Sequence, residues 1–110
     1  MGKLNEHTLE HVAHRFKILG EPMRLKLLNC LQEGELCVQD LVEQTGAGQA
    51  NISKHLSMLS SQGILGRRKE GLYVFYFIKD ETVYELCDLV CNSLEQNVAG
   101  MQQALNASDV

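Results

Sequence analysis

The sequence predicts a mainly α-helical domain with one small β-hairpin, and three observations lead to this prediction. Apolar residues recur at helical spacing over most of the 110 residues. The pattern changes only between residues 64 and 78, where β-branched and aromatic residues flank a Glu70-Gly71 turn. The length suits one domain, so we expect residues 1–110 to fold together.

Two helices are expected in the first third of the chain. The first covers residues 6–19 and is followed by Gly20, a residue that commonly ends helices. The second begins at Pro22, because proline lacks the amide hydrogen that has no partner in a first helical turn, and it runs up to Gly34. The apolar residues of the first helix are Leu9, Val12, Phe16 and Leu19.

Two short helices then form a helix-turn-helix pattern over about residues 36–62. We expect them at residues 35–45 and 48–62, with glycines between them that permit a tight turn. The side of the second helix that faces the core carries Ile52, Leu56 and Leu59.

The hairpin, over about residues 64–78, follows directly and forms a two-stranded wing. A last helix is expected over about residues 80–105, because Asp80 can cap it and apolar residues share one side. About five helices and one wing in this order make a winged helix-turn-helix fold. The apolar residues of the last helix are Val83, Leu86, Val90, Leu94 and Met101.

The first and last helices predict a homodimer. Their apolar sides, at residues 6–19 and 80–105, exceed what so small a core can cover. Packing against a second copy would bury them.

Charge is distributed unevenly along the chain, although its net value is −4. Residues 47–79 hold five basic residues and one acidic residue, whereas residues 80–110 hold six acids and no lysine or arginine. Because cations supply most of the affinity for DNA phosphates, a DNA-binding surface is confined to the middle of the chain.

Small, polar or basic residues gather on the outward side of the second helix of the helix-turn-helix. Such a face lets a helix backbone approach base edges in the major groove while a cation meets phosphate or guanine. Gln49 can also reach adenine, and three consecutive cations follow in the wing. The candidate DNA-binding residues are Gln49, Ala50, Ser53, Lys54, Ser57, Arg67, Arg68 and Lys69.

From Phe16 to Phe77 the chain resembles the ArsR/SmtB repressors. The resemblance is carried by three blocks in order, Phe16–Leu25, Gly34–Leu41 and Asn51–Leu56. It implies a winged-helix dimer that represses transcription by covering a promoter and leaves the DNA when an inducer binds. Two recognition helices related by a two-fold axis would read an imperfect inverted repeat in double-stranded DNA. The resemblance also implies DNA contacts in the recognition helix and the wing; we expect His55, on the inward side, to be a structural hydrogen-bonding residue.

The sequence does not identify the inducer, because two metal-binding sites known in the ArsR/SmtB family are incomplete in this chain. Of the three cysteines in its metalloid site, only Cys37 is present, with Gln39 and Val42 at the other two places. The zinc site of its last helix requires histidine, and no histidine follows His55. No cofactor is therefore certain, and a soft metal or metalloid ion bound by cysteines is one possibility.

Four cysteines form two candidate sensing pairs. Cys87 and Cys91 lie one turn apart, about 6 Å between β-carbons, which suits a soft metal or metalloid better than a disulfide. Cys30 and Cys37 flank a turn and could meet, as suits oxidation or persulfide chemistry. The alternative for both pairs is that the cysteines are small structural residues.

Three histidines, His7, His11 and His14, share one face of the first helix. Their spacing could hold a borderline metal ion, but the triplet includes no carboxylate or thiol, which favours a solvated face.

Other functions are less consistent with the sequence. The cysteines have no recognisable catalytic block around them, so an enzyme is not expected. A winged-helix protein-interaction module, or a regulator without an inducer, is the alternative, but the former has no need of Lys54 and the wing cations. Neither a signal peptide nor a membrane span is recognisable, so we expect a cytoplasmic protein with no membrane partner.

Overall fold

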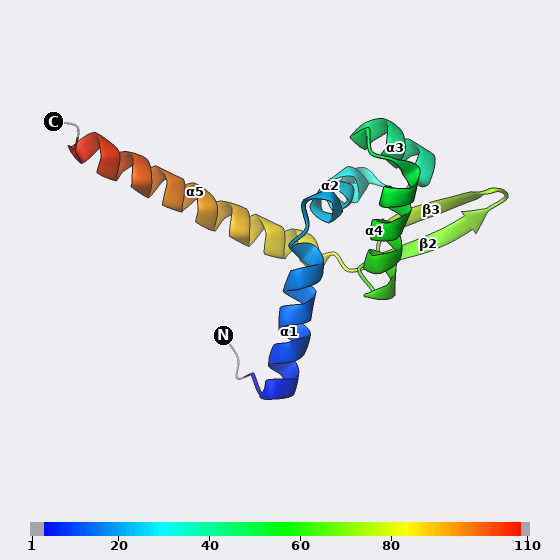
Figure 1. Ribbon diagram of the computed structural model, residues 1–110, viewed down its shortest axis with the longest axis horizontal. Helices are drawn as coiled ribbons and strands as arrows, with labels where there is room; N and C mark the ends of the chain where they lie inside the picture. Colours follow the sequence, from blue (N-terminus) through cyan, green and yellow to red (C-terminus); the bar gives the residue numbers. More distant parts are fainter. Residues whose placement is uncertain (1–3, 109–110) are drawn as a thin grey trace. The chain divides into compact units, whose positions relative to one another are not determined.

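The protein, described here by a computed structural model, has five α-helices and a small antiparallel sheet within residues 4–108 (Figure 1). Those residues form two units, one ending at Asp80 and one beginning at Glu81. The side chains of Met101 and of residues 104–108 are outside the description. The elements are α1 (Glu6–Leu19), α2 (Pro22–Cys30), the 3₁₀ helix η1 (Leu31–Glu33), β1 (Leu36–Cys37), α3 (Val38–Thr45), α4 (Gln49–Ser61), β2 (Leu65–Glu70), β3 (Tyr73–Ile78) and α5 (Thr82–Ser108).

Side-chain caps set the beginnings of the first two helices. The Asn5 carboxamide oxygen accepts a hydrogen bond from the Thr8 amide at 2.9 Å, which satisfies one of the free amides of α1. Pro22 occupies the first turn of α2, as expected, and Glu21 accepts from the Arg24 amide at 3.1 Å. Both helices begin where the sequence predicts, but α2 ends at Cys30, and the rest of the predicted second helix, Leu31–Glu33, is the 3₁₀ helix η1.

The core of the first unit lies between α2, α3 and α4, with residues of the sheet closing it. Seven side chains in it are almost completely buried, and all of them are leucine or isoleucine. Six come from helices or the start of β2, and Ile64 comes directly before that strand. They are Leu27, Leu41, Ile52, Leu56, Leu59, Ile64 and Leu65.

The third helix begins three residues later than the sequence pattern predicts. Leu36 and Cys37 form the strand β1, which pairs with Tyr76 and Phe75 of β3. The Asp40 carboxylate accepts a hydrogen bond from the Cys37 amide at 3.1 Å, so the helix starts at the next residue. The wing therefore belongs to a three-stranded sheet of order β1-β3-β2 rather than standing as two strands alone.

The hairpin of β2 and β3 extends away from the helices of the first unit (Figure 1). Its turn is Gly71-Leu72, one residue beyond the predicted place, and Gly71 has a φ of 60° that favours glycine. A β-carbon at Gly66 would lie 2.4 Å from the Phe77 ring, so glycine lets that ring pack against β2. The Gly71 turn and the packing of Phe77 at Gly66 thus shape the hairpin that forms the wing.

The turn between α3 and α4 matches the predicted helix-turn-helix. Gly46 ends α3 with a φ of 73°, a conformation that glycine adopts without strain. The Thr45 hydroxyl donates to the Leu41 carbonyl at 2.7 Å and accepts from the Ala47 amide at 3.1 Å. These bonds fix the short connection from which α4 starts.

The second unit is the long helix α5. Four of its apolar side chains are exposed in the single chain: Leu89, Val90, Leu94 and Val98. No described helix is both long and apolar enough to cross a membrane.

Candidate nucleic-acid interface

The helix α4 has one buried side and one polar, exposed side. Ile52, Leu56 and Leu59 are 0% exposed, which anchors the helix to the core. Of the candidate DNA contacts on α4, Ser53 is half-buried and the other four are exposed: Gln49, Ala50, Lys54 and Ser57. The helix thus presents small side chains and one cation outward, an arrangement that can enter a major groove.

A polar bridge of three residues joins α4 to the region between α1 and α2. Arg24 donates from Nε to His55 Nδ1 at 3.0 Å and from a terminal nitrogen to the Ile18 carbonyl at 3.2 Å. Glu21 lies 3.7 Å from His55 Nε2. Since His55 is 8% exposed and hydrogen-bonded, its predicted structural role is confirmed.

Arg24 is a residue that sequence reasoning did not single out. The signal that could have found it is the prediction of a buried His55, because a buried imidazole requires a polar partner. Through His55, Arg24 positions the recognition helix without lying on its outward face.

The three cations of β2 point to two different faces of the sheet. Arg67 and Lys69 pair with Tyr76 and Val74, whereas Arg68 pairs with Phe75. Since successive side chains in a strand alternate, Arg67 and Lys69 share one face and Arg68 lies on the other. All three side chains are exposed.

Arg68 is held by two carboxylates. Its guanidinium forms ion pairs with Glu35 and, at 2.6 Å, with Glu70, and it lies 4.9 Å from the centre of the Phe75 ring. The hydrogen bond from Arg68 lowers the pKa of Glu35, and the two carboxylates raise the pKa of Arg68. Arg68 is therefore locally neutralised.

The remaining cations of this surface are uncompensated. Lys54, Arg67 and Lys69 form no ion pair with any described residue. Three positive charges on α4 and the wing thus remain available for an anionic partner such as DNA phosphate.

The candidate sensing cysteines are all free thiols. Cys37 is buried, and its thiol donates to the Asp40 carboxylate at 3.2 Å. The hydrogen bonds from the Cys37 thiol and amide lower the pKa of Asp40. The Cys37 thiol is thus buried and already engaged by a carboxylate of its own helix.

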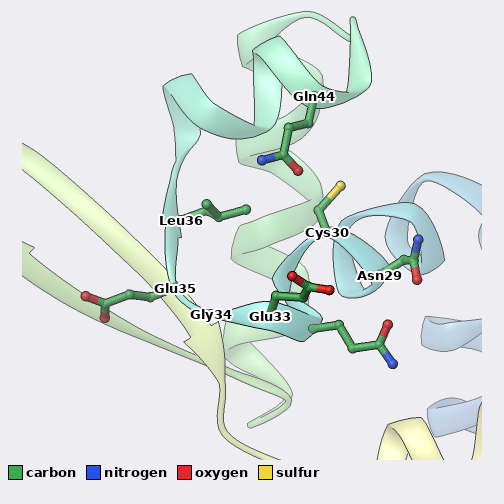
Figure 2. Close-up of a pocket in the computed structure, with 8 residues that line it drawn as sticks. Asn29, Cys30, Glu33, Gly34, Glu35, Leu36 and Gln44 are labelled. Carbon is green, nitrogen blue, oxygen red and sulfur yellow. The ribbon is translucent and has the colours of Figure 1, made fainter.

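Cys30 lies in a different environment, at a surface pocket of about 480 Å³. Figure 2 shows its sulfur directed toward Gln44, with Leu36 on the other side of the hollow. Cys37 does not line this pocket. The lining residues are Asn29, Cys30, Gln32, Glu33, Gly34, Glu35, Leu36 and Gln44.

Cys87 and Cys91 lie one turn apart on α5. Burial, and secondly the charge of Asp88, raise the pKa of the Cys87 thiol. Cys91 is exposed, and its thiol donates to Glu95 at 3.8 Å. Within the described residues, no group of three or more histidine, cysteine or acidic side chains is arranged to hold a metal ion.

A recognition helix exposed beside a cationic wing defines a winged helix-turn-helix protein of the DNA-binding class. Residues 21–66 match the family described as bacterial regulatory protein, arsR family. The chain is 42% identical over 82 residues to an HTH-type transcriptional regulator of Methanocaldococcus jannaschii, covering 74% of this chain and 92% of that one. The chain belongs to the arsR family.

Further relatives have the same fold or a named regulatory role. A cadmium resistance transcriptional regulatory protein, CadC of Listeria innocua, is 37% identical and covers 88% of this chain and 82% of its own. The homodimeric winged helix-turn-helix domain Mb0332 of Mycobacterium bovis is 30% identical, with a TM-score of 0.72 over 87% of this chain and 92% of that one. The antimony-specific repressor AntR is 28% identical, with a TM-score of 0.77 over 90% of each chain.

These comparisons assign the protein to DNA-binding transcriptional regulators. The relatives are named as regulators rather than enzymes, which points to a non-enzyme.

Proposed function

We propose that the protein is a homodimeric repressor that covers an imperfect inverted repeat in double-stranded DNA. The observation that carries this proposal is the exposed polar face of α4 next to uncompensated cations of the wing. In each protomer, Gln49, Ala50, Ser53 and Ser57 face base edges while Lys54, Arg67 and Lys69 meet phosphates. Arg68 lies on the other face of the wing and is already paired with two carboxylates.

The homodimer forms through α1 and α5. On α1, Leu9 is 47% and Phe16 is 53% exposed in the single chain, and α5 exposes four further apolar side chains. In a two-fold dimer, these apolar sides of α1 and α5 would be buried against the same helices of the second protomer. The Mycobacterium bovis relative is homodimeric. Two recognition helices related by that axis would read half-sites one helical turn apart.

Replacing both Lys54 and Arg67 with Ala is expected to weaken DNA binding and its dependence on salt. Each phosphate contact contributes about one unit to the slope of log K against log salt concentration, so the slope falls by about two units per protomer. Fluorescence anisotropy with a labelled duplex over a range of salt concentrations measures it.

The matched control is Arg68→Ala, which removes an arginine of the same strand whose charge two carboxylates already offset. Its slope should change by less than that of Arg67→Ala. Equal slopes for the wild type and the double variant would contradict the assignment of Lys54 and Arg67.

The inducer that releases DNA is a thiol-reactive agent, either a soft metal or metalloid or else an oxidant or persulfide. Four free thiols in this chain and relatives named for cadmium and antimony support this class. Cys87 and Cys91 offer two soft ligands, and a third would come from elsewhere, such as Cys37 or the partner subunit. Cys30, which is half-buried at a pocket, and Cys37 offer the thiol-oxidation route.

The double variants Cys87→Ser/Cys91→Ser and Cys30→Ser/Cys37→Ser separate these routes. With the wild type, arsenite or a persulfide donor should weaken DNA binding about 5- to 150-fold, the range of an allosteric coupling of 1–3 kcal/mol. The variant that lacks the responding pair should keep its DNA affinity and lose this response in a mobility-shift titration. If both variants release DNA as the wild type does, the cysteines do not sense the inducer.

A further inference from the structure

Two histidines of α1 bring the same ring nitrogen close together. His7 Nε2 and His11 Nε2 lie 3.1 Å apart, and their rings meet edge to face with centroids separated by 4.5 Å. Both side chains are exposed, so the point between the two nitrogens is accessible to solvent.

This separation is close to what a shared metal ion requires. In a tetrahedral zinc site the Zn–N bonds are about 2.0–2.1 Å long, which places two ligand nitrogens about 3.3 Å apart. The His7–His11 distance differs from that value by a few tenths of an ångström, a difference that a small rotation of exposed rings removes.

The N-terminal cap of α1 holds His7 in the helix, one turn before His11. The Asn5 side chain accepts hydrogen bonds from both the amide and the hydroxyl of Thr8, at 2.9 and 3.0 Å. This cap keeps the first turn helical, and in a helix residues four apart are neighbours on the surface. His7 and His11 are thus preorganised although they lie near the beginning of the helix.

We propose that His7 and His11 bind a borderline divalent ion, such as Zn²⁺, Ni²⁺ or Cu²⁺, through their Nε2 atoms. Imidazole nitrogens suit these ions, whereas Mg²⁺ and Ca²⁺ require oxygen ligands. The other coordination positions are open to water or an added carboxylate. The site includes none of the cysteines of the proposed sensing pairs and lies opposite the apolar side of α1, so the proposed dimer leaves it accessible.

His14 is the matched control for this site. It lies on the same face of α1 and is also exposed, but the described contacts include none between its ring and either of the other two. If mere histidine content explained metal binding, all three positions would be equivalent.

Nuclear magnetic resonance of the imidazole nitrogens during a ZnCl₂ titration of the full chain tests the proposal directly, because thiol binding elsewhere does not shift these signals. The Nε2 resonances of His7 and His11 should move together, and MgCl₂ should move neither. Unshifted Nε2 signals at Zn²⁺ concentrations that saturate the thiols would overturn the proposal, leaving the pair as a hydrogen bond between two imidazole rings.

Variants give the second readout. His7→Gln and His11→Gln should each weaken Zn²⁺ binding at the remaining imidazole more than about tenfold, since loss of groups that only orient a ligand already costs about 10- to 100-fold. His14→Gln should bind Zn²⁺ at His7 and His11 as the wild type does. An equal loss in all three variants would contradict a two-histidine site.

Discussion

Replacing Leu56 with Ala is expected to lower the free energy of unfolding by about 2–5 kcal/mol. Leu56 is 0% exposed and belongs to the recognition helix, so its truncation leaves a cavity where α4 meets the core. A domain of this size has about 5–15 kcal/mol of stability in total, and the variant would lose a large part of it. Urea unfolding followed by circular dichroism, at one fixed protein concentration, measures the change.

The control is Met58→Ala on the same helix, where the side chain is 37% exposed. Its loss should cost less than that of Leu56, because more than a third of the side chain is already exposed to solvent and its truncation leaves no enclosed cavity. Similar urea midpoints for the two variants would show that Leu56 does not anchor α4.

Replacing Leu94 with Glu is expected to convert the dimer to monomers. Leu94 is 58% exposed in the single chain and belongs to the apolar side of α5, so a charge there would be buried in the proposed interface. A monomer contacts one half-site at a time and loses the avidity of two linked sites, which is worth about 10²–10⁴ in affinity. Sedimentation equilibrium and DNA titration should therefore change together.

Gln96→Glu places the same charge two residues away on an exposed position of α5. We expect this control to remain dimeric and to bind DNA with nearly unchanged affinity. A Leu94→Glu protein that is still dimeric at micromolar concentration would contradict dimerisation through this side of α5.

The helices and the polar, exposed side of α4 could be predicted because they depend on local patterns. Leu56 and its neighbours repeat at helical spacing, Gly46 stands where the turn requires a left-handed residue, and Lys54 falls on the opposite side from the leucines. Each of these features is decided within a few residues along the chain. The sequence is therefore sufficient for them.

The features that the sequence pattern missed depend on contacts between distant residues. β1 forms because Leu36 and Cys37 meet β3, about 40 residues further along, so the segment read as helical is a strand. Arg68 is paired with Glu35, 33 residues away, and three consecutive cations are consequently not equivalent. Arg24 reaches His55 across 31 residues. Strand β1, the pairing of Arg68 and the Arg24–His55 hydrogen bond all depend on tertiary contacts, which a local sequence pattern does not reveal.

The salt dependence of the wild-type protein's affinity for duplex DNA tests the central claim most directly. If Lys54, Arg67 and Lys69 of both protomers meet phosphates, the six contacts give a slope of log K against log salt of about −5. A duplex containing the inverted repeat should bind more tightly than a scrambled duplex at every salt concentration. Affinity that does not depend on salt, or that is equal for the two duplexes, would contradict a sequence-specific DNA-binding regulator.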